Sequence, residues 1–336
     1  MISRGDDGSG ARGPCGVRGA TIFQWAQEQG EVGGVRTSHT QLTEVLRDAG
    51  HDVRYVDTGS ATRAVRALPA LLSRRGLHLF HVTRLWRAVL LAPVFVLLPG
   101  RAVLVLHSGS TQRQVAALPS QLRWVLRAAL HAYDEIWAVN DQIRDVLPQA
   151  LRDRVTVVTP FDATAVPAVP TDVRDLHAVA LATNAGLAHY NADLGIDVGR
   201  VVRATWPDAT LAVLAYGTKG PELETLQAHV AAEPWVSLSF DLDPDGVSAV
   251  LHRVGTFLRP TSWDGDSVIV REALASGARV VASDVAPRPV GVELAPLDVR
   301  ALADAVLHGG TPSDGSGLTA TTLVQAAIAA LARLQS

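Results

Sequence analysis

The sequence predicts an α/β protein in which two domains, each a parallel sheet covered by helices, face a shared cleft. The first observation is length, because 336 residues exceed the roughly 250–300 that one hydrophobic core serves. The second is the alternation of short apolar runs with amphipathic helical segments. The third is a Pro-, Ala- and Thr-rich stretch, 161–172, after which the alternation starts again. Because ligands of such sheets bind at the carboxyl ends of the strands, the cleft is the expected site.

The first half of the chain predicts one domain, residues 19–165, which follows a disordered Gly-, Arg- and Asp-rich tail at 1–18. Its first helix is indicated by Leu42, Val45 and Leu46, which share one helical face, and by Gly50, which ends the pattern. The expected strands are 20–25, 52–56, 77–82, 102–106, 135–139 and 155–158. The expected helices are 37–49, 62–72 and 120–131.

The second half, 166–336, repeats the pattern and predicts the second domain. The expected strands are 178–182, 210–215, 236–240, 255–258 and 279–283. The expected helices are 197–205, 222–231, 245–251, 268–276 and 299–307. An Ala- and Leu-rich helix at 319–334 follows, and the sequence leaves open whether it packs back on the first domain.

Composition excludes several classes of protein. Cys15 is the only cysteine, which excludes a disulfide framework and a cysteine-rich zinc site. The net charge of −3 argues against a nucleic-acid partner. The longest uncharged apolar stretch, 88–100, is broken by Pro93 and Pro99 and is shorter than the ~20 residues of a membrane span. With no apolar signal segment at the start, a cytoplasmic location is expected.

The charges are unevenly distributed along the chain. Residues 1–160 carry 19 arginines against 13 acidic residues, whereas residues 161–336 carry 11 basic and 20 acidic residues. Between Thr58 and Tyr133 there are ten arginines and no acidic residue. Three interpretations of this basic region stay open: a solvated helical face, attraction of an anionic acceptor such as a phosphorylated lipid or sugar, and peripheral contact with the inner face of an anionic membrane.

The strongest motif lies in the segment 256–292. An apolar strand ends at Pro260, a polar turn containing glycine follows, and a helix is expected to begin near Val268. Asp264 precedes this helix, and Glu272 lies within it eight residues later. Because a helix N-terminus offers unpaired N–H groups and a positive dipole end, the turn suits phosphate or sugar oxygens.

This segment resembles the retaining glycosyltransferases of the GT4 type, which have the GT-B fold. That family places an acidic residue, seven intervening residues and a glutamate in a strand–loop–helix unit, followed by Ala-x-x-x-Gly and a Val-Val strand. The corresponding residues here are Asp264, Glu272, Ala273 to Gly277, and Val280-Val281. Weaker similarities occur in the family's order at Gly33-Gly34 with His39, at 104–109, at 155–161 and at Tyr216-Gly217. The resemblance therefore extends along most of the chain.

The resemblance implies a role for each motif residue. Asp264 would contact hydroxyls of the donor sugar, Glu272 would bind the nucleotide ribose, and His107 would touch the sugar or the acceptor. Gly33 and Gly34 would let a loop backbone approach the donor closely. The residues expected around the diphosphate are Gly265, Asp266, Ser267 and Val268. No metal or other cofactor is expected, because the family usually needs none and the acidic residues do not have calcium-loop spacing.

One departure from the family concerns the diphosphate leaving group. The family usually places an Arg and a Lys in the first loop of the donor domain, yet 182–195 contains neither. The charge of the leaving group must still be stabilised, and such electrostatics are often the largest catalytic contribution. The candidate substitutes are Arg259, Arg271, Arg288 and Lys219. Arg271 and Arg288 are the favoured pair, because both belong to the donor-site segment.

The expected function is that of a retaining glycosyltransferase, which moves a sugar from a nucleotide-sugar donor to an acceptor hydroxyl. Assembly of polysaccharide, glycolipid or specialised metabolites would be its setting. One alternative is a non-catalytic GT-B protein that binds sugars or supports a partner transferase, and the missing Arg/Lys pair is its best argument. Another is a different GT-B enzyme, such as a sugar-nucleotide epimerase or a phosphorylase, which the Asp264–Glu272 unit disfavours.

Overall fold

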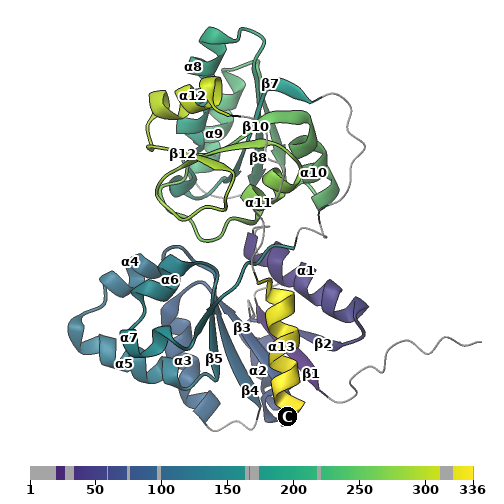
Figure 1. The fold of residues 1–336 in the computed structure, drawn as a ribbon, viewed down its shortest axis with the longest axis vertical. Coiled ribbons are helices and arrows are strands. Elements are labelled where there is room, and N and C mark those ends of the chain that lie inside the picture. The colour runs from purple at the N-terminus through teal and green to yellow at the C-terminus, as the bar shows by residue number, and fades with distance from the viewer. Residues whose placement is uncertain are drawn as a thin grey trace, which may run out of the picture.

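Two six-stranded parallel sheets, each flanked by helices, lie one above the other in the computed structural model (Figure 1). The structure describes residues 20–26, 34–58, 60–73, 76–96, 100–162, 166, 174–217, 221–310 and 321–335. The tail at 1–18, Gly33, Lys219 and most of the stretch 161–172 lie outside the described residues, so the predictions made for them stay predictions.

The first sheet has the strand order β2-β1-β3-β4-β5-β6. Its strands are β1 (Thr21–Ala26), β2 (Asp52–Asp57), β3 (Gly76–Val82), β4 (Arg101–Leu106), β5 (Glu135–Ala138) and β6 (Val155–Val157). Successive side chains point to opposite faces, so Leu79 and Phe80 enter two different core clusters. Because helices cover both faces, the central strands β3 and β4 are buried at nearly every position.

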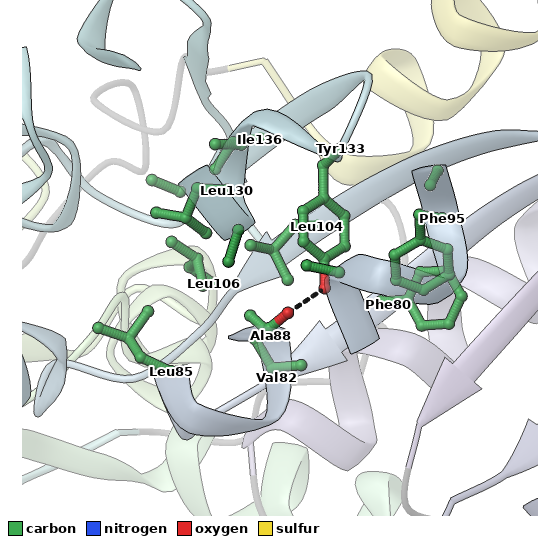
Figure 2. Packing of buried hydrophobic residues seen from close by; sticks show 14 of the residues in the cluster. Phe80, Val82, Leu85, Ala88, Phe95, Leu104, Leu106, Leu130, Tyr133 and Ile136 are labelled. Atoms are coloured by element: carbon green, nitrogen blue, oxygen red, sulfur yellow. Dashed lines mark hydrogen bonds between the residues drawn. The ribbon is translucent and has the colours of Figure 1, made fainter. Parts of the chain in front are cut away.

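Helices enclose this first sheet on both sides. They are α1 (Gly34–Asp48), α2 (Ala61–Ala67) with the 3₁₀ turn η1 (Leu68–Leu72), α3 (Leu85–Val96), α4 (Thr111–Ala116), α5 (Ser120–His131), α6 (Asp141–Val146), α7 (Gln149–Arg152) and α13 (Leu323–Gln335). One face is packed by η1, α3 and α5, and Figure 2 shows Leu85, Ala88 and Phe95 of α3 inside this core. The opposite face is packed by α1 and α13.

Helix α13 returns from the second half of the sequence to the first sheet (Figure 1). Leu323 and Leu331 are buried in the same cluster as Leu42 of α1. The Arg333 guanidinium donates hydrogen bonds to both carboxylate oxygens of Glu135, at 2.7 and 2.8 Å. The last described helix is therefore part of the first domain's core.

The second sheet has the order β12-β11-β10-β7-β8-β9. Its strands are β7 (Asp175–Asn184), β8 (Thr210–Tyr216), β9 (Val236–Phe240), β10 (Val254–Arg259), β11 (Arg279–Ser283) and β12 (Val292–Ala295). Its helices are α8 (Ala192–Thr205), α9 (Pro221–Ala231), α10 (Pro244–Arg253), α11 (Val268–Ala275) and α12 (Val299–His308), with a short 3₁₀ turn η3 (Ala188–Tyr190). One face is packed by α8, α9 and α12, and the other by α10 and α11.

Several features of the fold were not predicted, among them the short helices α4, α6 and α7. Helix α3 includes most of the apolar stretch 88–100, for which no helix was predicted. Strand β12 adds an unpredicted edge strand to the second sheet. The helix expected at 62–72 is divided into α2 and η1. Pro69 explains the division, because it has no N–H to continue α-helical hydrogen bonding. Among the described helices, none combines the length and the apolar character needed to cross a bilayer.

Candidate active site

A cavity of about 360 Å³ lies between the carboxyl ends of the two sheets. The first domain contributes Thr37 of α1 and residues that follow β3, β4 and β6, namely Thr83, His107, Ser108, Gly109 and Pro160. The second domain contributes residues at or just after β7, β8, β9 and β10, together with the start of α11. This is the cleft position that the fold class predicts.

The backbones of the two domains meet directly beside the cavity. A Cβ atom added to Gly109 would lie 1.8 Å from the carbonyl oxygen of Asp264. A Cβ added to Gly265 would lie 2.5 Å from the carbonyl oxygen of His107. Only glycine allows an approach this close, so both positions depend on the missing side chain.

The N-terminus of α11 opens onto this cavity. Ser267, Val268 and Ile269 line it, and Ser267 makes no side-chain capping bond. The first backbone N–H groups bonded within this helix are those of Val270 and Arg271, which donate to the Ser267 carbonyl oxygen. The preceding N–H groups have no acceptor among the described residues, which is the usual state of a helix start and suits an anion.

Asp264 is held by two buried guanidinium groups. Arg259 donates from Nε to Oδ2 of Asp264 at 2.9 Å, and Arg288 donates from Nη1 to the same oxygen at 2.8 Å. The Gly265 N–H donates to Oδ1 at 3.0 Å. Burial alone would raise the pKa of Asp264, but the two arginines lower it to about 2. The group therefore stays ionised, and the three side chains together carry a net charge of +1.

Of the two arginines in this group, Arg259 is the one that lines the cavity. Its Nη1 donates to the Ala182 carbonyl oxygen at 3.1 Å, at the carboxyl end of β7. Its guanidinium carbon lies 4.8 Å from the centre of the Tyr190 ring. Burial opposes its charge, but the Asp264 carboxylate outweighs burial and raises the pKa of Arg259 above its usual value. Its Nη2 has no hydrogen-bond partner among the described residues and remains available to a ligand.

The other two arginines of the segment have different surroundings. Arg288 is buried behind Asp264, and its Nη2 donates to Thr261 Oγ1 at 3.0 Å. Arg271 donates from Nε to Asp266 Oδ1 at 2.7 Å, within a pair whose side chains are mostly buried. Burial raises the pKa of Asp266, although Arg271 acts in the opposite direction. Neither arginine is among the residues that line the cavity, so Arg259 has the access that Arg271 and Arg288 lack.

Glu272 lies on α11 and lines the cavity one turn after Val268. Its carboxyl group makes no hydrogen bond to the described residues. Burial raises its pKa to about 7, because no cation compensates the loss of water. An ionised carboxylate only accepts hydrogen bonds, so Glu272 suits a ligand that brings hydroxyl groups.

His107 forms part of the first domain's wall. Its Nε2 lies 2.8 Å from Nδ1 of the buried His81. Burial, followed by the nearby His39, lowers the pKa of His107 to about 3. Burial also lowers the pKa of His81, with smaller contributions from His107 and His39. The His81–His107 pair is therefore neutral at physiological pH, and it can share one proton between the two rings.

Aromatic residues complete the second domain's wall. The rings of His189 and Trp263 stack with centroids 3.8 Å apart, and the hydroxyls of Tyr190 and Tyr216 are hydrogen-bonded to each other. The two tyrosines and His189 were not predicted from the sequence. Tyr216 follows the carboxyl end of a predicted strand and precedes Gly217, a signal that could have found it. His189 and Tyr190 lie in the loop 182–195, and no sequence motif marks them as site residues.

The structure brings most of the predicted site residues together. Those that line the cavity are His107, Asp264, Gly265, Asp266, Ser267, Val268 and Glu272. Gly34 is the first residue of α1, whose Thr37 reaches the cavity, whereas Gly33 is outside the described residues. No cluster of three or more His, Cys, Asp or Glu suited to a metal ion occurs in the described part of the chain. A metal-free site stays a prediction.

Solved structures share this fold at low sequence identity. The N-terminal domain of Candida albicans trehalose-6-phosphate phosphatase has a TM-score of 0.68 at 9% identity, covering 95% of this chain and 97% of that one. HepE from Anabaena in complex with UDP has a TM-score of 0.63 at 13% identity, covering 94% and 95%. A variant of S. aureus TarM, also in complex with UDP, has a TM-score of 0.57 at 14% identity, covering 73% of this chain and 50% of TarM.

These likenesses establish the fold. The chain has the fold of the GT-B glycosyltransferases, with two parallel six-stranded sheets around a cleft. It spans about half the length of the TarM structure. No protein-family model matches the chain, and no curated protein is similar enough in sequence to match it.

Proposed function

We propose that this protein is a glycosyltransferase, which moves a sugar from a nucleotide-diphosphate donor to an acceptor hydroxyl in the cavity between the sheets. The observation that carries the proposal is Arg259. It is a permanently charged side chain with one unpaired nitrogen, in a cavity that also contains the N-terminus of α11. A departing nucleoside diphosphate carries negative charge, which these two groups would stabilise.

Arg259 takes the place of the Arg/Lys pair that is missing from the first loop. Its bond to the Ala182 carbonyl oxygen places the guanidinium where that loop begins. Asp264 holds Arg259 in one orientation, and Arg288, which does not line the cavity, holds Asp264 from behind, so both act as positioning residues. Arg271 is a weaker substitute, since Asp266 already neutralises it.

The rest of the donor follows from the same geometry. Glu272 would accept hydrogen bonds from the ribose hydroxyls, and the stacked Trp263 and His189 would offer an apolar edge to a sugar ring. The neutral His107 would hydrogen-bond a hydroxyl of the donor sugar or of the acceptor. Retention at the anomeric carbon, and the GT4 subtype, rest on the resemblance of the Asp264–Glu272 unit.

For the acceptor we propose a chemical class. The acceptor would be a sugar, a lipid-linked sugar or a small molecule that enters from the first-domain side of the cavity. A cytoplasmic location and a metal-free reaction belong to the same proposal. A non-catalytic sugar-binding protein is the main alternative, and it predicts nucleotide binding without turnover.

Calorimetric titration with nucleotides tests the two central assignments. UDP is the first ligand to use, because the HepE and TarM structures contain it, and GDP, ADP and CDP follow. Wild type should bind the nucleoside diphosphate more tightly than the monophosphate. Arg259→Gln should lose at least tenfold of that preference, since a hydrogen bond to a charged group contributes ~1.5–3 kcal/mol. Monophosphate binding reports whether the variant has kept its fold, and Arg259→Lys offers a second variant that keeps the charge.

Glu272 is tested with a matched pair of ligands. Wild type should prefer UDP over its 2′,3′-dideoxy analogue, and Glu272→Gln should remove most of that preference. Arg300→Gln, on the exposed face of α12, is the control and should bind like wild type. Absence of binding by every nucleoside diphosphate would refute the donor site. Binding without transfer would favour the non-catalytic alternative, and the anomeric configuration of any product tests retention.

A further inference from the structure

Helix α3 exposes an apolar stripe that no described part of the chain covers. Trp86, Leu90 and Val94 are 52%, 66% and 36% exposed, and each follows the previous one by four residues. This spacing places them in one row along the helix. The inner side of α3 is also apolar, because Leu85 and Ala88 are packed in the core (Figure 2). A helix that is apolar on both sides is unusual for a surface exposed to water.

The neighbouring helices continue the apolar surface. Val65, Leu68 and Leu72 are exposed on α2 and η1, and Leu122 and Trp124 are exposed on α5. The η1 turn, α3 and α5 pack their inner sides into one core cluster, so they cover the same face of the first sheet. Helices α3 and α5 also contact each other directly. These eight residues and Val96, which is also exposed on α3, are nine of the fifteen exposed large hydrophobic residues in the described chain, and we call these nine the outer apolar surface.

Arginines surround the outer apolar surface. Arg66, Arg84, Arg123 and Arg127 are exposed, and within the described residues none of them has a carboxylate partner. Arg87 lies over the Trp86 ring, with its guanidinium carbon 5.6 Å from the ring centre. The absence of any acidic residue from Thr58 to Tyr133 leaves this charge uncompensated along the sequence. The surface is therefore both apolar and strongly positive.

We propose that the outer apolar surface docks on an anionic lipid membrane. Tryptophan favours the headgroup region of a bilayer, and apolar helix faces bury shallowly below it. Arginine side chains can extend from the same helices to lipid phosphates. The second half of the chain, residues 161–336, has nine more acidic than basic groups. An anionic membrane therefore repels the second half of the chain and attracts the first half.

Charge also disfavours a second copy of the chain as the partner that covers the outer apolar surface. A two-fold symmetric pair would place this surface against itself and bring arginine against arginine without acidic partners.

The position of α3 adds a functional consequence. Thr83 lines the cavity and α3 begins two residues later, so docking would bring the rim of the cavity close to the lipid headgroups. Docking itself does not depend on the proposed glycosyl transfer.

Vesicle flotation tests the proposal directly. The probes are vesicles of phosphatidylcholine with 30% phosphatidylglycerol, and pure phosphatidylcholine vesicles, each at 50 and 300 mM NaCl. Wild type should float with the anionic vesicles, at least tenfold more weakly at the higher salt. Arg123→Gln with Arg127→Gln should weaken binding by about fivefold for each lost charge. Trp86→Ser with Leu90→Ser should weaken it at least tenfold.

The controls are exposed residues of the second domain. Val290→Ser removes a side chain that is 77% exposed, and Arg300→Gln removes an exposed cation, and both variants should float like wild type. A blue shift of tryptophan fluorescence on adding anionic vesicles should be lost in Trp86→Phe with Trp124→Phe. Binding to neither vesicle type, or wild-type binding by all surface variants, would overturn the proposal. A dimer in sedimentation that Trp86→Ser with Leu90→Ser dissociates would overturn it too, because a second copy would then cover the surface.

Discussion

Asp264 accepts hydrogen bonds from two buried arginines, which gives this motif residue a structural role. The sequence motif suggested a direct contact between this carboxylate and the donor sugar. In the structure Oδ2 is shared by Arg259 and Arg288, and Oδ1 accepts from the Gly265 N–H. Its main effect is to keep Arg259 charged and fixed at the cavity. The residue still lines the cavity, so a sugar contact and a positioning role are compatible.

Asp264→Asn should strongly destabilise the protein. The substitution leaves two guanidinium groups buried with no compensating charge, which typically costs about 3–5 kcal/mol. Urea denaturation measures the free energy of unfolding. Asp304→Asn, at an exposed position of α12, is the control and should change it by less than about 0.5 kcal/mol. Equal stability of the two variants would mean that the arginines do not depend on Asp264.

Glu272 should make the stability of the unliganded protein depend on pH. Its pKa is about 7 in the folded protein and about 4.5 in the unfolded chain, so the folded state binds the proton more tightly. The stabilising contribution is complete below pH 4.5 and is lost as the pH rises through 7. Its size is about 3 kcal/mol, at ~1.36 kcal/mol per pKa unit.

The measurement is urea denaturation of wild type and Glu272→Gln between pH 4.5 and 8. The difference between the two proteins should change across this range, with wild type losing stability relative to the variant as the pH rises. Other titrating groups are present in both proteins and cancel in the difference. A constant difference across the range would contradict a raised pKa for Glu272.

At the scale of elements, α3 is fixed to the core of the first domain by both packing and a hydrogen bond. The Tyr133 hydroxyl donates to the Ala88 carbonyl oxygen at 2.8 Å, deep in the core that Figure 2 shows. Phe95 packs against Tyr133 with ring centroids 5.0 Å apart. These contacts hold one side of α3 rigidly while its other side carries the exposed stripe.

Tyr133→Phe isolates the hydrogen bond from the packing of the ring. We expect the free energy of unfolding to fall by about 1 kcal/mol, the usual net contribution of one hydrogen bond. Tyr133→Ala removes the ring as well and should cost about 3–5 kcal/mol, as large-to-small core changes do. Thermal or urea unfolding of the three proteins gives both values. A Phe variant as unstable as the Ala variant would show that packing is not the larger contribution.

Helices and strands were predicted best where their buried and exposed side chains follow one clear pattern. The helix at 120–131 and the strands at 236–240 and 279–283 were predicted with their observed bounds, because each shows one clear pattern. Helix α3 was missed because its apolar residues occur on all sides, so no helical period stands out. Strand β12 was missed because it is a four-residue edge strand with little apolar alternation.

At the scale of the whole molecule, the backbones of the two domains approach each other closely beside the cavity. Gly109 follows β4 of the first sheet, and Asp264 and Gly265 precede α11 of the second. Helix α1 also contacts α11 across the same boundary. This contact closes the cavity beside the predicted donor residues, so its geometry controls access to the site.

Gly109→Ala should separate the two domains. The new Cβ would lie 1.8 Å from the Asp264 carbonyl oxygen, so one backbone must move. We expect a larger radius of gyration in small-angle X-ray scattering, and nucleotide binding at least tenfold weaker than in wild type. Gly310→Ala is the control, because a Cβ there meets nothing within 4 Å. An unchanged radius and affinity for Gly109→Ala would show that the domains do not need this close approach.

The sequence by itself determined the α/β class, most strands and helices, and the segment 256–292, several residues of which line the cavity. These features depend on local periodicity and on motif spacing within about 40 residues, both of which can be seen in one stretch of chain. Only the tertiary structure decided which arginine reaches the cavity. Arg259, Arg271 and Arg288 look alike in the sequence, and their differences come from Asp264, Asp266 and the depth at which each is buried.

The tertiary structure also decided the place of α13 and the meaning of the basic region. An amphipathic helix shows that one face is buried but not which sheet it covers, and α13 packs on the first domain because the apolar side chains that complement it lie there. The arginines from Thr58 to Tyr133 were visible in the sequence, but the exposure of the apolar side chains between them was not. A stripe counts as exposed only when the rest of the fold leaves it uncovered, and that depends on contacts between residues far apart in the chain.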